Sequence, residues 1–362
     1  MDSERYIRVF IDPGNALPTT GTGVYTRSLI EGLHKYGSSN IRIVESDICS
    51  YSSSLRPLHR LIYLRRLRKK QLQVIDAPHV FHFTNVYTPK KLRHVGFVTT
   101  IHDIDPIVLP ETHSYRFQLY FKNAVKNSAL HSDIILTDTE ASRSLLIEYL
   151  NGFEKQVKAI PIGVSLEFAE YVDSALQEDQ QNVPLLLYVG SLSRKKNTAW
   201  LIRTICQGVR KGRFPKLKLV LVGSAGYGFS EIEKALRDAG DIVQWKQGVS
   251  KKELASIYIN CSIVILPSFT EGFGLPLIEA MYCGKPIVAS NIPTSKEVAS
   301  KAALYFDLND NEGFYAAVQS ALEDSSRAER LTFIKGHIKK YLWQNIIHEY
   351  ETIYNNVAPR ND

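Results

Sequence analysis

The sequence is poor in cysteine and contains no long apolar run. Its four cysteines, Cys49, Cys206, Cys261 and Cys283, include no C-x-x-C pair, which excludes a disulfide framework and a zinc site of the usual spacing. No apolar run approaches the roughly 18 residues that a membrane-spanning helix needs. Residues 1–5 include acids, unlike the start of a secretory signal, so we expect a cytoplasmic protein.

The length and composition bound the domain organisation. The chain has 362 residues, of which 44% are hydrophobic and 22% charged, and this composition excludes collagenous and disordered chains. A single hydrophobic core stops growing at roughly 250–300 residues. We therefore expect two domains.

Short apolar runs alternate with amphipathic, helical stretches along the whole chain. We expect these runs to be strands, at 7–11, 41–44, 79–83, 96–101, 134–137 and 157–160, and again at 185–189, 218–222, 243–248, 263–266, 286–289 and 303–306. Buried, β-branched strands separated by helices are typical of parallel sheets. The pattern predicts an α/β fold of two doubly wound, Rossmann-like domains. Ligands of such sheets bind beyond the carboxyl ends of the strands, so we expect the site in a cleft between the domains.

A polar, acidic stretch separates the two series of strands. We predict an N-terminal domain over 1–170, a linker over 171–183 and a C-terminal domain over 184–341. A helix over 342–358 is expected to pack back on the N-terminal domain.

The net charge of +7 indicates anionic partners. Most basic residues are dispersed and no nucleic-acid-binding motif is present, so we exclude nucleic acid as a partner. The segment 55–72 differs, because it has seven basic residues among leucines and isoleucine, and no acid lies between 48 and 75. This pattern predicts a basic amphipathic helix. It is either a solvated helix or a surface for anionic membrane or a phosphorylated acceptor.

Two glycine-rich turns follow predicted strands. Gly21 and Gly23 precede a helix expected over 25–36, where backbone amides can approach an anion. The second turn, 223–228, has the spacing G-x-x-G-x-G rather than the G-x-G-x-x-G of dinucleotide-binding folds. This spacing argues against an NAD-dependent oxidoreductase.

The stretch 267–280 (PSFTEGFGLPLIEA) combines two glycines with two carboxylates. The glycines let backbone amides approach a ligand, and Pro276 suits the first turn of a helix. Glu271 in the loop and Glu279 in the helix could each present an acceptor to a polyhydroxyl ligand. The alternative for Glu279 is a charge that stabilises the helix N-terminus.

Three consecutive cations, Arg194, Lys195 and Lys196, follow the strand at 185–189. Fixed cations and amides can stabilise a leaving diphosphate without a metal. A D-x-D tripeptide at 103–105 offers a metal site as an alternative, although a divalent ion needs more oxygen ligands than this pair. His102 precedes it at a strand end, where it either faces a ligand or is a buried, hydrogen-bonded core residue.

These motifs resemble those of a known family. The segment 271–279 looks like the E-x7-E motif of the retaining, nucleotide-sugar-dependent glycosyltransferases of family 4, which have the GT-B fold. Residues 188–197 (YVGSLSRKKN) and 281–290 (MYCGKPIVAS) are similar to further motifs of that family. The resemblance extends from Ile7 to about Tyr354, and the segment 100–113 looks most like mannosyltransferases of surface-polysaccharide assembly.

The resemblance implies a role for each candidate residue. Lys196 would bind phosphate, Glu279 the ribose, and His102 would lie against the donor hexose. Glu271 would bind the sugar hydroxyls, together with the backbone of Gly272, Phe273, Gly274 and Leu275. Some members carry an arginine where this chain has Ser191. The second phosphate cation is then Arg194 or Lys195.

The resemblance implies a retaining, metal-independent hexosyltransferase with no cofactor. Its N-terminal domain would bind a glycan or lipid-linked acceptor, and its C-terminal domain a nucleotide sugar, with GDP-mannose as the first choice and UDP-hexoses next. Contact with an anionic membrane through 55–72 would make the protein peripheral at the inner face of the membrane. The alternatives are a non-catalytic nucleotide-sugar or lipid-binding protein and an NAD-dependent oxidoreductase.

Overall fold

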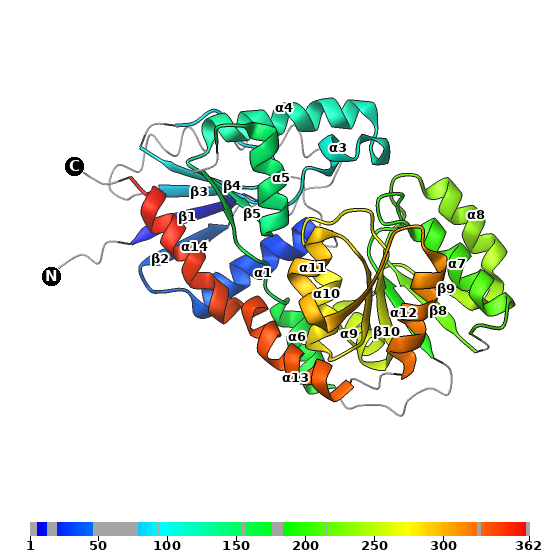
Figure 1. Ribbon diagram of the computed structural model, residues 1–362. Coiled ribbons are helices and arrows are strands. Elements are labelled where there is room, and N and C mark those ends of the chain that lie inside the picture. The colour runs from blue at the N-terminus through cyan, green and yellow to red at the C-terminus, as the bar shows by residue number, and fades with distance from the viewer. Residues whose placement is uncertain are drawn as a thin grey trace. The chain divides into compact units, whose positions relative to one another are not determined.

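The computed structural model describes residues 6–12, 20–45, 79–92, 94–153, 156–175, 184–214, 216–323 and 327–359. The chain forms two compact units (Figure 1). Unit 1 comprises 1–108, 114–163 and 340–362, and unit 2 comprises 109–113 and 164–339. The segment 55–72, expected to be a basic amphipathic helix, lies outside the described residues.

Unit 1 is built on a six-stranded parallel sheet in the order β2-β1-β3-β4-β5-β6. Its strands are β1 Ile7–Asp12, β2 Ile41–Glu45, β3 His79–Phe83, β4 Gly96–Thr100, β5 Ile134–Thr137 and β6 Val157–Ala159. Its helices are α1 Gly21–Tyr36, α3 Asp105–Val108, α4 Tyr115–His131, α5 Glu140–Leu150 and α14 Trp343–Val357. Strands β3 (HVFHF) and β4 (GFVTT) are buried throughout, as is typical of the central strands of a parallel sheet.

Unit 2 repeats this architecture with a second parallel sheet in the order β12-β11-β10-β7-β8-β9. Its strands are β7 Leu185–Val189, β8 Lys218–Val222, β9 Val243–Lys246, β10 Ile263–Leu266, β11 Ile287–Ser290 and β12 Ala303–Phe306. Its helices are α6 Leu166–Ser174, α7 Thr198–Arg210, α8 Phe229–Ala239, α9 Lys251–Asn260, α10 Leu275–Tyr282, α11 Pro293–Ala299, α12 Asn311–Glu323 and α13 Arg327–His337. Single 3-10 turns lie at Pro110–Thr112, Gly240–Ile242, Ser300–Ala302 and Ile338–Tyr341.

The α/β fold of two Rossmann-like domains is confirmed. Each of the strands expected from the sequence forms, and the differences are confined to strand ends. The largest difference is at β9, which ends at Lys246 rather than at 248. Gly248 has a left-handed φ of 64°, which ends the extended backbone.

The boundary between the units differs from the expected linker over 171–183. Helix α6 begins after Ser165, whose hydroxyl accepts a hydrogen bond from the Phe168 amide at 3.4 Å. Phe168 is fully buried and packs edge-on against Tyr258 of α9, with ring centroids 5.4 Å apart. Unit 2 therefore begins at Val164, and residues 171–174 form the last turn of a packed helix.

The C-terminal helix α14 lies in unit 1, against α1 and β4. Trp343 is buried at its first residue, and a side chain at Gly163 would approach the Trp343 indole nitrogen to 2.6 Å. Tyr350 reaches the hydroxyl of Tyr25 on α1 at 3.2 Å. The close contact with Gly163 and this buried hydrogen bond fix the helix on the unit.

None of the helices in the described parts of the chain combines the length and apolar character that a membrane span requires.

Candidate functional site

The strand order of unit 2 reverses between β7 and β10. The chain runs outward from β7 to β8 and β9, and then returns to place β10 on the other side of β7. At such a switch point the loops after the two central strands diverge and leave room for a ligand. The loop after β7 carries Arg194, Lys195 and Lys196, and the loop after β10 carries Glu271. The topology thus brings the two sequence motifs together.

Lys196 and Glu271 form an ion pair across this switch point. The Lys196 ammonium donates to one oxygen of Glu271, while Ser268 donates to the other at 2.6 Å. The Ser268 carbonyl in turn accepts from the Ser290 hydroxyl at the end of β11, at 2.7 Å. Thr294 holds the Glu271 backbone carbonyl at 2.8 Å. The carboxylate is therefore fixed through both its side chain and its backbone.

The charge on Glu271 is retained despite burial. Burial alone would raise the pKa of this carboxyl, but Lys196, Lys195 and the hydrogen bond from Ser268 hold it below its ordinary value. Lys195 also binds the second loop through its backbone, because its carbonyl accepts from the Phe269 amide at 3.0 Å. Arg194 is exposed instead. Of the two candidates for a second cation, Lys195 is the one that acts on Glu271.

The turn after β7 requires glycine. Gly190 and Gly223 end the neighbouring strands β7 and β8, with φ values of 150° and 147°. A Cβ on Gly223 would lie 2.0 Å from the Gly190 carbonyl oxygen. This close approach brings the loop after β7 against the loop after β8, where Leu192 forms a β-bridge with Ala225.

Glu279 is buried in α10 and accepts a hydrogen bond from the Tyr258 hydroxyl at 2.7 Å. The helix begins after Gly274, whose φ is 88°, and Pro276 lies in its first turn as expected. Gly272 and Phe273 are buried in the preceding loop, and Leu275 is half-buried. Glu279 thus pairs with Tyr258, whereas Glu271 pairs with Lys196.

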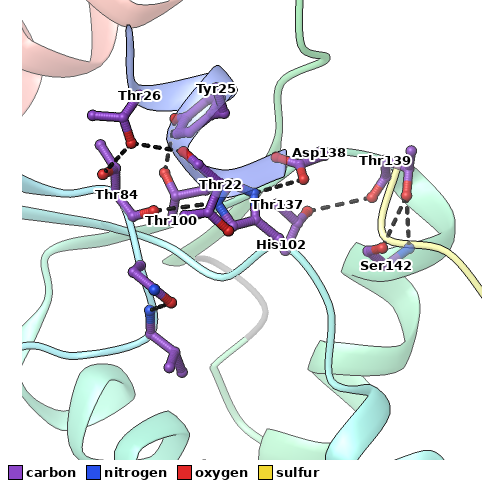
Figure 2. A network of polar contacts seen from close by, with 12 residues as sticks. Thr22, Tyr25, Thr26, Thr84, Thr100, His102, Thr137, Asp138, Thr139 and Ser142 are labelled. Atoms are coloured by element: carbon purple, nitrogen blue, oxygen red, sulfur yellow. Dashed lines mark hydrogen bonds and ion pairs between the residues drawn. The ribbon is translucent and has the colours of Figure 1, made fainter. Parts of the chain in front are cut away.

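In unit 1, His102 lies at the carboxyl end of β4. Figure 2 shows its ring between Asp138, which follows β5, and Thr84, which follows β3. Nδ1 lies 2.8 Å from Asp138 Oδ2, and Nε2 lies 3.2 Å from the Thr84 carbonyl oxygen. Both partners are acceptors, so the ring satisfies both when it carries both protons. A sugar hydroxyl could bind the ring at Nε2 only by replacing the Thr84 carbonyl.

The surroundings favour the imidazolium. Burial opposes the charge, but Asp138 outweighs burial and raises the pKa of His102. The Tyr25 ring packs edge-on against His102 at 4.9 Å, and its hydroxyl bonds Thr100 at 3.0 Å. Thr100 also bonds His82, whose pKa burial lowers to about 3. Burial therefore favours the neutral form of His82, whereas Asp138 favours the charged form of His102, and the two rings lie on either side of the Tyr25–Thr100 bond.

The glycines of the first turn differ from expectation. Helix α1 begins at Gly21 rather than at 25, with Thr20 as its N-cap. The Gly23 amide donates to the Thr20 hydroxyl at 3.2 Å, so it satisfies the helix end. Gly21 is exposed at the same end.

The D-x-D tripeptide forms a local turn. The Asp103 carboxylate accepts from the Asp105 amide at 3.2 Å, and Asp105 is buried at the start of α3. Within the described ranges, no three histidine, cysteine, aspartate or glutamate side chains lie together as a metal site would require.

Sequence reasoning missed the partners of the candidate residues. Asp138 directly follows β5 just as His102 follows β4, and the two strands are neighbours. A search for polar residues after each apolar run would have found it. Ser268 and Tyr258 carry no comparable signal, because serine and tyrosine are common in loops and helices of any function.

Two family descriptions match the chain, one in each half. "Glycosyltransferase Family 4" matches residues 19–168, and "Glycosyl transferases group 1" matches residues 173–335.

The sequence is similar to curated bacterial glycosyltransferases. It is 28% identical to O-antigen chain mannosyltransferase B of Escherichia coli over 300 residues, covering 79% of this chain and 76% of the relative. It is 26% identical to O-antigen chain mannosyltransferase RfbU of Salmonella typhimurium, covering 75% and 72%. A D-inositol 3-phosphate glycosyltransferase of Corynebacterium jeikeium is 25% identical, with coverage of 63% and 58%.

Solved structures share the fold. Sucrose-phosphate synthase of Thermosynechococcus elongatus superposes with a TM-score of 0.71 at 20% identity, over 97% of this chain and 99% of that one. HepE of Anabaena, solved with UDP and glucose, gives 0.68 at 15% identity, over 96% and 99%. With both halves matched and the paired Rossmann-like sheets in place, the chain belongs to the family 4 glycosyltransferases of the GT-B fold.

Proposed function

We propose that this glycosyltransferase moves mannose from GDP-mannose to a hydroxyl of a glycan or lipid-linked acceptor, with retention of the anomeric configuration and without a metal. The two O-antigen mannosyltransferases among its relatives support mannose as the sugar. The observation that carries the proposal is the ion pair of the half-buried Lys196 with the buried Glu271 at the switch point of unit 2.

This pair matches the chemistry of a nucleotide sugar. A departing diphosphate develops negative charge, and a fixed cation stabilises it. When the diphosphate takes over Lys196, one Glu271 oxygen becomes available to accept from a sugar hydroxyl. Ser268 and Thr294 keep the carboxylate in place during that exchange. Glu279 would accept from the ribose in place of Tyr258, and Lys195 would add the second cation.

Unit 1 would contribute the fixed imidazolium of His102. Because both its nitrogens are engaged, we propose that it orients the hexose through its charge and the peptide around it. No carboxylate is assigned as a covalent nucleophile. Retention would follow if the leaving phosphate itself accepted the acceptor proton during front-face attack.

Thermal stabilisation by a panel of GDP-sugars and UDP-sugars tests the donor. A ligand at 100 times its dissociation constant adds about 2.7 kcal/mol to the free energy of unfolding. GDP-mannose should raise the unfolding temperature more than UDP-glucose does. Stabilisation by UDP-sugars alone would reassign the donor, and stabilisation by no nucleotide would contradict the proposal. Stabilisation without turnover would favour a non-catalytic binding protein.

A further inference from the structure

The ring of Tyr25, in the second turn of α1, packs against the His102 ring (Figure 2). Tyr25 is fully buried, and the two rings meet at an interplanar angle of 82°. Aromatic pairs in this edge-to-face arrangement stabilise a contact beyond the area that they bury. The hydrogen bonds to Asp138 and Thr84 hold His102 at its two nitrogens, so its ring can still tilt about the line that joins them. The Tyr25 ring supplies a third contact, which limits this tilt.

Tyr25 is itself anchored through its hydroxyl. This hydroxyl lies 3.0 Å from Thr100 Oγ1, at the end of β4, and 3.2 Å from the hydroxyl of Tyr350 on α14. Burial raises the pKa of Tyr25 and of Tyr350, so both hydroxyls keep their protons and can donate. One anchor therefore comes from the strand that leads into His102, and the other comes from the C-terminal helix.

The next residue of α1 acts on the opposite side of His102. The Thr26 hydroxyl bonds the Thr84 hydroxyl at 2.7 Å, and the Thr84 amide donates to the Asp12 carbonyl at 3.0 Å. The Thr84 carbonyl beside His102 Nε2 thus belongs to a residue that is fixed through both its side chain and its backbone. Two consecutive residues of α1 therefore hold His102, Tyr25 directly and Thr26 through Thr84.

We propose that Tyr25 is a positioning residue for His102 and that Tyr350 of α14 holds Tyr25 in this role. The proposal rests on the proposed function, in which the His102 imidazolium orients the donor hexose. A displacement of about 1 Å in a reacting geometry can cost on the order of 100-fold in rate, so a small tilt of this ring matters. All three residues belong to unit 1, so their arrangement can be measured without a donor or an acceptor.

Solvent exchange of the His102 ring N–H protons tests the proposal. It is followed by NMR of the full chain with isotope-labelled histidine, at about pH 6, where the imidazole of His102 carries both protons. The His102→Gln variant identifies the signals. Tyr25→Leu removes the aromatic contact and should speed the exchange roughly 3–10-fold. Tyr25→Phe and Tyr350→Phe keep the rings but remove the anchoring bonds, and each should speed it about threefold.

Tyr354→Phe is the matched control for Tyr350→Phe. Tyr354 is buried on the same helix, but its hydroxyl lies 2.8 Å from His82 Nδ1. This variant should speed exchange of the His82 ring and leave His102 as in wild type. Unchanged His102 exchange in Tyr25→Leu and Tyr25→Phe would overturn the proposal. Equal acceleration of His102 by Tyr350→Phe and Tyr354→Phe would also overturn it, because the tyrosines would then only stabilise the fold.

Turnover of GDP-mannose separates this role from the proposed function. Tyr25→Leu should lower kcat at least about tenfold and leave the affinity for bare GDP as in wild type, because unit 2 is assigned the nucleotide. A wild-type kcat in Tyr25→Leu, or a loss of GDP affinity as large as the loss of kcat, would contradict the positioning role. If the wild type turned over no nucleotide sugar, the proposed function would fail, whereas the exchange rates would still decide whether Tyr25 positions His102.

Discussion

The ion pair of Lys196 and Glu271 makes a prediction about nucleotide binding. Lys196→Gln should weaken binding of bare GDP by roughly 10–100-fold, since hydrogen bonds to charged groups are worth about 1.5–3 kcal/mol. Glu271→Gln should leave GDP affinity within a few-fold of wild type, because it releases Lys196 from its partner, and should chiefly lower kcat.

Calorimetry with GDP measures both variants, and Lys211→Gln, an exposed lysine of the same unit, is the control. If Glu271→Gln weakened GDP binding as much as Lys196→Gln, the assignment of separate phosphate and sugar roles would be wrong.

His102 makes a second prediction, on pH. Its folded-state pKa is raised above the ordinary 6.5, so its contribution to stability is fully present below that pH and is lost as the pH rises through the folded pKa. The stabilisation that Asp138→Asn removes should therefore be largest at pH 6.5 and just below, and should shrink as the pH rises above the ordinary pKa of histidine. Urea unfolding at several pH values measures it.

Asp133→Asn is the matched control, since Asp133 pairs with Lys91 rather than with a histidine. Its effect should not follow this trend. A constant effect of Asp138→Asn across the whole window would show that His102 is not the titrating partner.

At the scale of elements, the turns after β7 and β8 depend on glycine. Gly223→Ala should lower the free energy of unfolding by at least about 2 kcal/mol, because its Cβ would meet the Gly190 carbonyl oxygen at 2.0 Å and its φ is 147°. Gly336→Ala in α13 is the control: nothing lies within 4 Å of its Cβ. That change should be neutral or stabilise by up to about 1 kcal/mol. Similar unfolding midpoints for the two variants would refute the account of this turn.

The elements themselves were largely predictable, and their partners were not. Apolar runs such as 79–83 and 185–189 specify buried strands because little else fits a parallel sheet covered on both faces. Helix ends were harder to predict than strands. Helix α1 begins at Gly21, within the expected glycine loop, because the Thr20 side chain caps the helix there. The last turn of α6 falls within the predicted linker, because the sequence becomes polar and acidic from Glu170 onward.

For the site, likewise, candidate residues were predictable from the sequence and their partners were not. The sequence indicates Glu271 and Lys196 as candidates, but their pairing follows from the strand order, which a single sequence does not state. Asp138 is hydrogen-bonded to His102 across 36 residues of the chain. Ser268 donates a hydrogen bond to Glu271, three residues further along the chain.

At the scale of the whole molecule, each unit has its own sheet and its own polar site. Unit 2 carries the cations and carboxylates of the family motifs, and unit 1 carries the His102–Asp138 pair. The chain returns to unit 1 through α14, so unit 1 is completed only by the last residues of the sequence. The proposed reaction assigns donor binding to unit 2 and hexose orientation to His102 of unit 1.

Time-resolved proton NMR of GDP-mannose hydrolysis in excess chelator tests the central claim most directly, since it needs no identified acceptor. Retention without a metal predicts that the wild type releases α-mannose first, before it equilibrates in solution, and that Lys196→Gln does so at least about tenfold more slowly. Initial release of β-mannose, turnover only after manganese or magnesium is restored, or no turnover of any nucleotide sugar would contradict the account.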